Sequence, residues 1–486
     1  MRIQWTSLVA VAALTACSQA TPEQQIVNDA AEALGGAEQV QAVTTLVLRG
    51  DGTHYNLGQD VLPGASGQTF DVTGYTRVID VAGGRSRTEM TREPNFQFFQ
   101  GPQPQTQING IDGDVAYNVA GNGTATRAGG AVATARQLEV LHHPVTAVKA
   151  ALAEGATLAN PRTEGGESLI DVTTASGQAF TLATDATSHL PTMVSHRADD
   201  TNLGDVVIST AFADYQEVNG VQVPSRLTVR TDDFTTADYR LTETAVNGGA
   251  GEIAAPEAAA SAPPPAAPAV NATAEVIAPG IWLIGGGSHH SVLVEFSDHL
   301  TLIEAPQNDA RTLAAIAKAR ETVPGKPLTQ LINSHHHFDH SGGVRAAISE
   351  GLTIITHEGN RAFFEEMAKR PHTINPDALQ NNPQPLAIET VADEHVLTDG
   401  TMTVNLYTVS GPHTETMLIA YFPRQQILTE VDVYTPGAAA HAFAADFLED
   451  LQARNLRIQR IVPLHGAPAP FAQLVKEAAS APASTN

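Results

Sequence analysis

The chain has 486 residues, which is too many for one hydrophobic core, so two or three domains are expected. Its fractions of 42% apolar and 16% charged residues are those of a globular protein and exclude a disordered one. The formal net charge of −25, from 52 Asp plus Glu against 27 Lys plus Arg, argues against nucleic acid as a partner, because nucleic-acid binding needs a basic face. An acidic, soluble protein is the expectation.

The first sixteen residues have the pattern of an export signal. One basic residue, Arg2, precedes an apolar run from Leu8 to Leu14 that is too short to span a bilayer as a mature helix. We therefore predict that residues 1–16 are a signal peptide and that the protein leaves the cytoplasm.

Cys17 follows this signal and is the only cysteine of the chain, so it can form no intramolecular disulfide. The stretch Leu14-Thr15-Ala16-Cys17 resembles the lipobox of bacterial lipoproteins, in which the cysteine is lipidated and becomes the first mature residue. The resemblance implies membrane contact through a lipid anchor on Cys17, and Ser18 fits sorting to the periplasmic face of the outer membrane. An ordinary secretory signal with an incidental cysteine is the alternative.

Residues 17–247 are predicted to form a mostly antiparallel β domain. A helix over residues 23–34 comes first, and short strands separated by Gly, Asn, Asp and Pro follow. Residues 212–224 resemble the strand pair in the half-barrels of periplasmic lipoprotein carriers, which implies a strongly curved sheet. His142-His143-Pro144 is interpreted as a loop pair at a helix start and not as a ligand pair, since no acidic or histidine partner stands nearby in sequence.

Residues 248–274 are predicted to be a linker. The run from Ala258 to Ala269 is rich in Ala and Pro, has no periodicity and contains no large apolar residue. A semi-extended segment between two independent cores is therefore expected.

In residues 275–486, strand and helix patterns alternate in two similar sets, which predicts an α/β domain of four layers. Strands are expected over residues 280–284, 291–296, 300–303, 327–333, 352–356, 402–409, 416–422, 426–428 and 459–463, and helices over 308–322, 359–370 and 442–454, with one more beginning after Gly343.

The segment Ser334-His335-His336-His337-Phe338-Asp339-His340-Ser341-Gly342-Gly343 places four potential metal ligands within six residues, between a buried strand and a helix start. In an extended backbone, residues two apart point the same way, so His335 and His337 can reach one cation while His336 points elsewhere. Asp339 and His340 are then free to hold a second cation. Two ions about 3.5–4 Å apart can share a water and stabilise both the attacking and the leaving oxygen.

Three further residues complete a family pattern: His413 in Ser410-Gly411-Pro412-His413-Thr414, Asp432 at the end of a strand, and His465 in Pro463-Leu464-His465-Gly466. With the first loop, they make residues 275–474 resemble the metallo-β-lactamase fold superfamily, whose domain is a four-layer αββα sandwich. The resemblance implies that His335, His337 and His413 hold one metal, that Asp339, His340 and His465 hold the other, and that Asp432 bridges them.

The implied activity is hydrolysis by a dinuclear zinc centre, although iron or manganese could occupy the same ligands. A metal-bound hydroxide would attack a small ester, lactone or β-lactam, and Asp339 would be catalytic by orienting the attacking water. The alternatives are a mononuclear iron oxygenase of the same fold and a non-catalytic envelope lipoprotein that binds a partner.

The chain departs from the family pattern at two places. Glu304-Ala305-Pro306 replaces the usual Asp-Thr-Gly, and Val431 replaces the glycine that usually precedes the bridging aspartate, so support of the site from behind the ligands is expected to differ. His289 and His290 are expected on a loop that borders the active-site groove, where a solvated loop is the alternative to substrate contact. His336 is interpreted as a spacer and His357 as structural, while His395 and His441 show no pattern.

Overall fold

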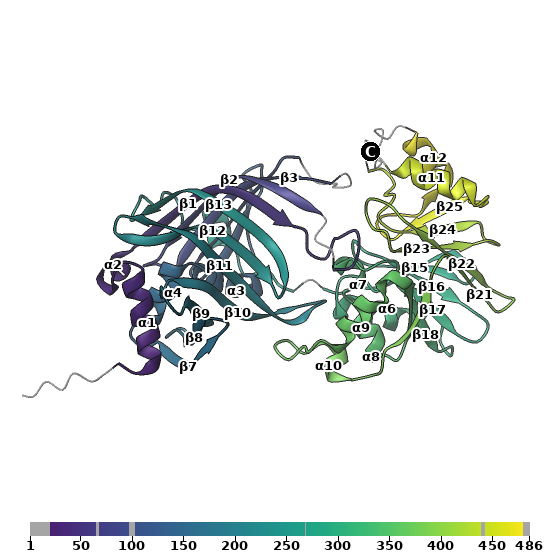
Figure 1. The fold of residues 1–486 in the computed structure, drawn as a ribbon. Helices are drawn as coiled ribbons and strands as arrows, with labels where there is room; N and C mark the ends of the chain where they lie inside the picture. The colour runs from purple at the N-terminus through teal and green to yellow at the C-terminus, as the bar shows by residue number, and fades with distance from the viewer. Residues whose placement is uncertain (1–19, 65–67, 97–102, 268, 439–442, 480–486) are drawn as a thin grey trace, which may run out of the picture.

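The computed structural model describes residues 20–64, 68–96, 103–267, 269–438 and 443–479. The predicted signal peptide, Cys17 and His441 lie outside these residues. Figure 1 shows two lobes, one built on a thirteen-stranded sheet and the other on a seven-stranded and a six-stranded sheet. No helix in the described ranges is long and apolar enough to cross a membrane.

The N-terminal lobe is one antiparallel sheet, as the sequence predicts. Its strands follow the chain on either side of a central β1–β13 pair, in the order β6-β5-β4-β3-β2-β1-β13-β12-β11-β10-β9-β8-β7. Their bounds are β1 (Thr45–Tyr55), β2 (Thr69–Asp80), β3 (Arg85–Pro94), β4 (Gln105–Asp112), β5 (Val115–Val119), β6 (Ala125–Arg127), β7 (Thr157–Glu164), β8 (Glu167–Thr173), β9 (Ala179–Asp185), β10 (Pro191–Asp200), β11 (Gly204–Val218), β12 (Val221–Thr231) and β13 (Phe234–Val246).

Helices fill the concave side of this curved sheet (Figure 1). They are α1 (Pro22–Ala33), α2 (Ala37–Ala42), α3 (Gly130–Val140) and α4 (Pro144–Ala151). The first begins one residue before the predicted start, because Thr21 and Gln24 form a reciprocal capping box around Pro22. Apolar side chains of the helices and of the inner sheet face make one core, which includes Val27, Leu48 and Val148.

The histidine pair of this lobe lies at a helix start, as predicted. His143 is the N-cap of α4, and its side chain accepts a hydrogen bond from the Val145 amide at 3.3 Å. His142 is 2.8 Å from both Thr210 and His196, so it belongs to a buried hydrogen-bond chain. Neither residue lies in a ligand cluster of the described residues.

The segment predicted to be a linker is partly packed. It contains the one-turn helix α5 (Glu257–Ala260), where Ala259 is fully buried. Carbonyl groups of the segment accept hydrogen bonds from Tyr117 and Arg127 of the N-terminal sheet. Alanine and proline bury little surface by themselves, but a neighbouring sheet with free donors holds them, and composition alone does not reveal that neighbour.

The C-terminal lobe is a four-layer sandwich with a core between its two sheets. The first sheet has the order β14-β15-β16-β17-β18-β19-β20 and the second has the order β21-β22-β23-β24-β25-β26. Their bounds are β14 (Thr273–Ala278), β15 (Ile281–Gly285), β16 (Ser291–Glu295), β17 (Leu300–Ile303), β18 (Leu328–Ile332), β19 (Thr353–His357), β20 (Ala387–Val391), β21 (Glu394–Thr398), β22 (Thr403–Val409), β23 (Met417–Phe422), β24 (Ile427–Glu430), β25 (Arg460–Pro463) and β26 (Ala469–Pro470).

Helices cover the outer faces of both sheets (Figure 1). The first sheet carries α6 (Asp309–Thr322), α7 (Phe338–Ser341), α8 (Val344–Ser349), the 3₁₀ turn η1 (Glu358–Asn360), α9 (Arg361–Lys369) and α10 (Ala378–Asn381), and the second carries α11 (Ala444–Ala453) and α12 (Phe471–Ala478). Strands β17 to β20 are parallel, as are β24 and β25, so several of their carboxyl ends meet at one edge.

The two lobes are in direct contact, although each has its own core. Asp205 accepts hydrogen bonds from the Thr373 and Ile374 amides at 2.8 and 3.0 Å. Asn202 donates to the Ser341 hydroxyl at 2.7 Å, and Arg370 pairs with Asp232. The lobes therefore have separate apolar cores, while polar contacts join their surfaces.

The burial of His143 makes the stability of the N-terminal lobe depend on pH. Burial, and after it the charge of Arg77, lowers the pKa of His143 to about 3. Below its ordinary pKa, His143 is therefore protonated in the unfolded chain and neutral in the folded chain. The free energy of unfolding is therefore highest above the pKa of the unfolded chain. It falls by about 2 kcal/mol as the pH falls from about 7 to about 5. Denaturant titrations at both pH values measure the loss.

The matched variant is His143→Asn, which keeps a capping acceptor and cannot titrate. We expect its stability to fall less over the same pH interval, while the buried His142 retains part of the dependence. An equal loss in both proteins would contradict the assignment to His143.

Candidate metal centre

The predicted metal loop follows the carboxyl end of β18 and turns into α7. Two glycines allow it to lie against α6. A Cβ atom on Gly343 would come within 1.8 Å of the Thr312 hydroxyl, and one on Gly342 within 2.1 Å of the Gln307 carbonyl oxygen. Any larger residue would push the loop away from the sheet edge, so both glycines set the depth at which the histidines lie.

The first ligand cluster consists of His335, His337, His413 and Asp432. The Nε2 atoms of His335 and His413 are 3.2 Å apart, and His413 Nε2 is 3.0 Å from Asp432 Oδ2. His335 and His337 come from the metal loop, while His413 follows β22 and Asp432 follows β24. This cluster contains the predicted ligands of one metal together with the predicted bridge.

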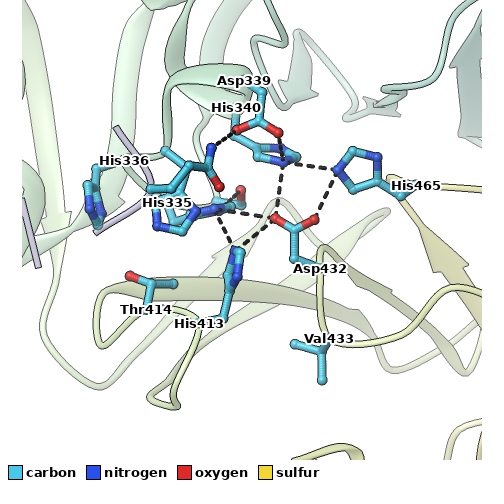
Figure 2. Close-up of polar contacts among 12 residues, drawn as sticks. His335, His336, Asp339, His340, His413, Thr414, Asp432, Val433 and His465 are labelled. Atoms are coloured by element: carbon cyan, nitrogen blue, oxygen red, sulfur yellow. Dashed lines mark hydrogen bonds and ion pairs between the residues drawn. The ribbon is translucent and has the colours of Figure 1, made fainter. Parts of the chain in front are cut away.

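The second cluster consists of His289, Asp339, His340 and His465. The Nε2 atoms of His340 and His465 are 3.1 Å apart. Asp432 joins the clusters, because Oδ2 is 3.1 Å from His340 Nε2 and Oδ1 is 3.0 Å from His465 Nε2. Figure 2 shows Asp432 between His413 on one side and His340 and His465 on the other. The structure thus brings all seven predicted ligands together.

His289 is the residue that sequence reasoning did not place among the ligands. Its Nε2 atom is 3.1 Å from Asp339 Oδ2, and its ring centre is 4.1 Å from that of His465. It lies on the loop after β15, which the structure places beside the ligand clusters. Its neighbour His290 belongs to neither cluster. A double histidine without local spacing offers no signal that separates the two.

Glu304, one of the departures from the family pattern, supports the clusters from behind. Its fully buried carboxylate accepts hydrogen bonds from Ser334 Oγ at 2.5 Å and Asn333 Nδ2 at 3.1 Å. The Ser334 hydroxyl also contacts His335 Nδ1 at 3.0 Å, and Glu304 Oε2 lies 3.4 Å from His340 Nδ1. Glu304 therefore acts on a ligand of each cluster through the nitrogen that faces away from the metal position.

The electrostatics hold three of the ligands, His335, His337 and Asp432, in the protonation states that bind metal. Burial, followed by the neighbouring histidines, lowers the pKa of His335 and of His337 well below the usual value, so both are neutral. Burial raises the pKa of Asp432, but the nearby His340 and His413 outweigh this and hold it well below its usual range. Deprotonated histidine and ionised aspartate are the forms that metals require.

His340 behaves oppositely. Burial lowers its pKa, but the carboxylates of Asp432 and Asp339 outweigh burial and raise it well above the usual value. The same contact with His340, with a hydrogen bond from His289, holds the pKa of Asp339 below its usual range against the effect of burial. The carboxylates of Asp432 and Asp339 thus favour positive charge at the position of His340.

The residues present fit two metal ions. Each cluster offers four ligand atoms within 4.8 Å of one another, all of them imidazole nitrogen or carboxylate oxygen. This donor set suits zinc, iron and manganese. A cavity of about 450 Å³ reaches His413 and is lined in part by Met417, Val433, Phe447 and Arg454, a size typical of a small-molecule site.

Three further histidines that the sequence analysis considered lie outside both clusters. His336 is buried and 3.2 Å from the Thr416 hydroxyl, and burial lowers its pKa to about 4. His357 is the N-cap of η1 and accepts a hydrogen bond from the Gly359 amide at 3.0 Å. His395 lies exposed on β21. His336 as a spacer and His357 as a structural residue agree with the sequence interpretation.

Comparison with known proteins places this site in a family context. Residues 284–428 match the family model described as the metallo-β-lactamase superfamily. The C-terminal region therefore contains a metallo-β-lactamase domain, with the αββα fold that the sequence predicts. Metal-dependent hydrolysis is typical of this superfamily, which also has members that are not hydrolases. No curated protein matches the chain in sequence.

Solved structures with a similar fold have low sequence identity to the chain. A metallo-β-lactamase from Hirschia baltica is 18% identical and covers 44% of this chain and 100% of its own, with a TM-score of 0.34. The metallo-β-lactamase FIM-1 from Pseudomonas aeruginosa, in a mono-zinc form, is 21% identical and covers 43% and 94%, with a TM-score of 0.33. The sec-alkylsulfatase Pisa1 from Pseudomonas sp. is 16% identical and covers 43% and 41%, with a TM-score of 0.33.

The position of His289 predicts an effect on one metal site. In His289→Ala, the second cluster loses one of its four donors, so we expect zinc affinity at that site to fall about 10- to 100-fold, the range seen when residues that support a metal are removed. Competition with a chromophoric chelator measures both dissociation constants. His290→Ala is the control and should leave both within about threefold. Equal zinc dissociation constants in the two variants would show that His289 does not bind the second metal.

Proposed function

We propose that the protein is a dinuclear zinc hydrolase that cleaves a small ester, lactone or β-lactam. The observation that carries the proposal is the pair of four-residue clusters joined by Asp432, whose oxygens lie 3.0 Å from His413 of the first cluster and 3.1 and 3.0 Å from His340 and His465 of the second. A structural metal site is closed by its protein ligands, whereas a catalytic site keeps a position for water or substrate. Two adjacent clusters that share a carboxylate fit the catalytic arrangement.

When bound, two zinc ions would supply an activated water and a Lewis acid for the oxygen of the scissile group. Asp339 orients the water. Its side chain is 39% exposed while that of Asp432 is 15% exposed, so Asp339 is the acid of the site that solvent reaches. The cavity beside His413 accepts the body of the substrate.

The metal content of the purified protein tests this proposal first. We expect about two zinc ions per chain when the mature protein is prepared without added metal. In Asp432→Ala, both clusters lose the shared carboxylate, so we expect loss of the two-metal state and a fall of at least about 100-fold in hydrolysis of a panel of lactones, esters and β-lactams.

Asp298→Ala is the matched control, because this carboxylate is 82% exposed at a turn. It should keep both metals and full activity. If the protein holds one iron per chain and consumes oxygen with persulfides, the hydrolase proposal is wrong and the protein is a mononuclear iron oxygenase. Two metals without turnover of any panel member, or activity retained in Asp432→Ala, would contradict the proposed chemistry.

We further propose that the protein is exported and held in the bacterial envelope by a lipid on Cys17, at the periplasmic face of the outer membrane. The lipobox-like Leu14-Thr15-Ala16-Cys17 supports this. Changing Cys17 to Ala removes the lipid attachment point, so we expect the protein to move from the membrane fraction to the soluble envelope fraction. Fractionation and immunoblotting measure this. Retention of Cys17→Ala in the membrane would mean that another segment anchors the protein.

A further inference from the structure

The loop between β1 and β2 belongs to the N-terminal lobe but lies against the metal centre. Its residues 56–64 are called the β1–β2 loop. The Gly58 carbonyl oxygen accepts a hydrogen bond from the Phe338 amide at 3.0 Å, beside the metal loop. The Val61 carbonyl oxygen accepts from the Glu415 amide at 2.9 Å and from the Thr414 hydroxyl at 3.2 Å, beside His413. The loop is therefore hydrogen-bonded to the two segments that carry the histidines of the first cluster.

One backbone group of this loop selects the tautomer of His337. The Nε2 atom of His337 is 2.9 Å from the Asp60 carbonyl oxygen, which can only accept, so Nε2 carries the hydrogen. A neutral imidazole then has its lone pair on Nδ1. That atom is buried and has no hydrogen-bond partner among the described residues, as expected of an atom that binds a metal. The Asp60 carbonyl thus prepares a ligand of the first cluster.

One side chain of the loop orients Asp339. The Gln59 amide donates from Nε2 to Asp339 Oδ1 at 2.7 Å. The other oxygen, Oδ2, is left facing His289 at 3.1 Å and His340 at 3.4 Å, inside the second cluster. Because Asp339 is partly exposed, its carboxylate would rotate more freely without this amide. Gln59 therefore holds a ligand of the second cluster in one orientation.

Gly58 allows the β1–β2 loop to lie close to Phe338. Its φ of +82° is a conformation that L side chains rarely adopt, and an added Cβ atom would lie 2.4 Å from the Phe338 ring. Only glycine allows the backbone to pass over this ring, which immediately follows His337 in sequence. The contact is thus specific to the position and not a general surface contact between lobes.

We propose that the active site is shared between the lobes, with the β1–β2 loop as its positioning element: the Asp60 carbonyl acts on the first metal site and the Gln59 amide on the second. This inference rests on the proposed dinuclear function. It assigns to the N-terminal β domain a role in metal binding, and it makes Gln59 a positioning residue that acts through Asp339.

Two substitutions of Gln59 in the full-length chain test the proposal. In Gln59→Ala, the donor is lost, so we expect zinc affinity at the second site to fall about 10- to 100-fold, while that of the first changes less than about threefold. In Gln59→Glu, a carboxylate of similar length faces the Asp339 carboxylate, so we expect a larger loss than in Gln59→Ala. A purely structural role predicts the reverse order, because Glu preserves the shape of the side chain and Ala does not.

Two measurements report these effects independently of turnover. Chelator competition gives both zinc dissociation constants near neutral pH, and the absorption spectrum of the cobalt-substituted protein reports the coordination of the second ion. Asp205→Asn is the matched control, since it weakens contacts between the lobes at Thr373 and Ile374, away from either cluster. The control should retain both constants and the cobalt spectrum of the unchanged protein.

The outcomes separate this inference from the proposed function. If the unchanged protein binds two zinc ions and both Gln59 variants retain its constants and spectrum, the shared site is overturned and the hydrolase stands. The same holds if Asp205→Asn weakens the second site as much as Gln59→Ala. If the unchanged protein fails to bind two metals, the proposed function is overturned and the shared site with it.

Discussion

The structure of the metal centre depends on the burial of Asp432 among histidines. Its two oxygens lie 3.0 to 3.1 Å from His413, His340 and His465, and its φ of +60° is unusual for a residue other than glycine. An ionised carboxylate buried without opposite charge would cost several kcal/mol. The charge that opposes it is on His340, whose pKa the carboxylates of Asp432 and Asp339 raise well above its usual value. His335, His413 and His465 also lie within 3.4 Å of the Asp432 oxygens.

The fold brings the ligands together around Asp432. The ends of β18, β24 and β25 and the turn between β22 and β23 each deliver ligands, so both sheets of the sandwich contribute. Glu304, at the end of β17, adds a buried carboxylate behind Ser334 and His340. A site made from several strand ends is rigid, because each ligand is continuous with a strand buried in the core between the sheets.

The N-terminal lobe contacts the metal centre of the C-terminal lobe. A loop that begins at the end of β1 touches one ligand of each cluster, through the Asp60 carbonyl and the Gln59 amide. Sequence reasoning assigned the two halves to independent cores, and the cores are indeed separate. It had no access to the contact itself, because 280 residues separate Gln59 from Asp339 and neither stands in a motif with the other.

The sequence by itself determined the strands and helices with strong apolar patterns, the αββα domain and the positions of seven clustered residues, because periodicity and short spacings are local properties. It did not predict the exposed edge strand β21, whose residues Glu394–Thr398 bury little surface. Only the tertiary structure decided that His289 joins the second cluster and that the β1–β2 loop reaches both clusters. These contacts join loops far apart in the chain, and their geometry follows from how the folded lobes pack.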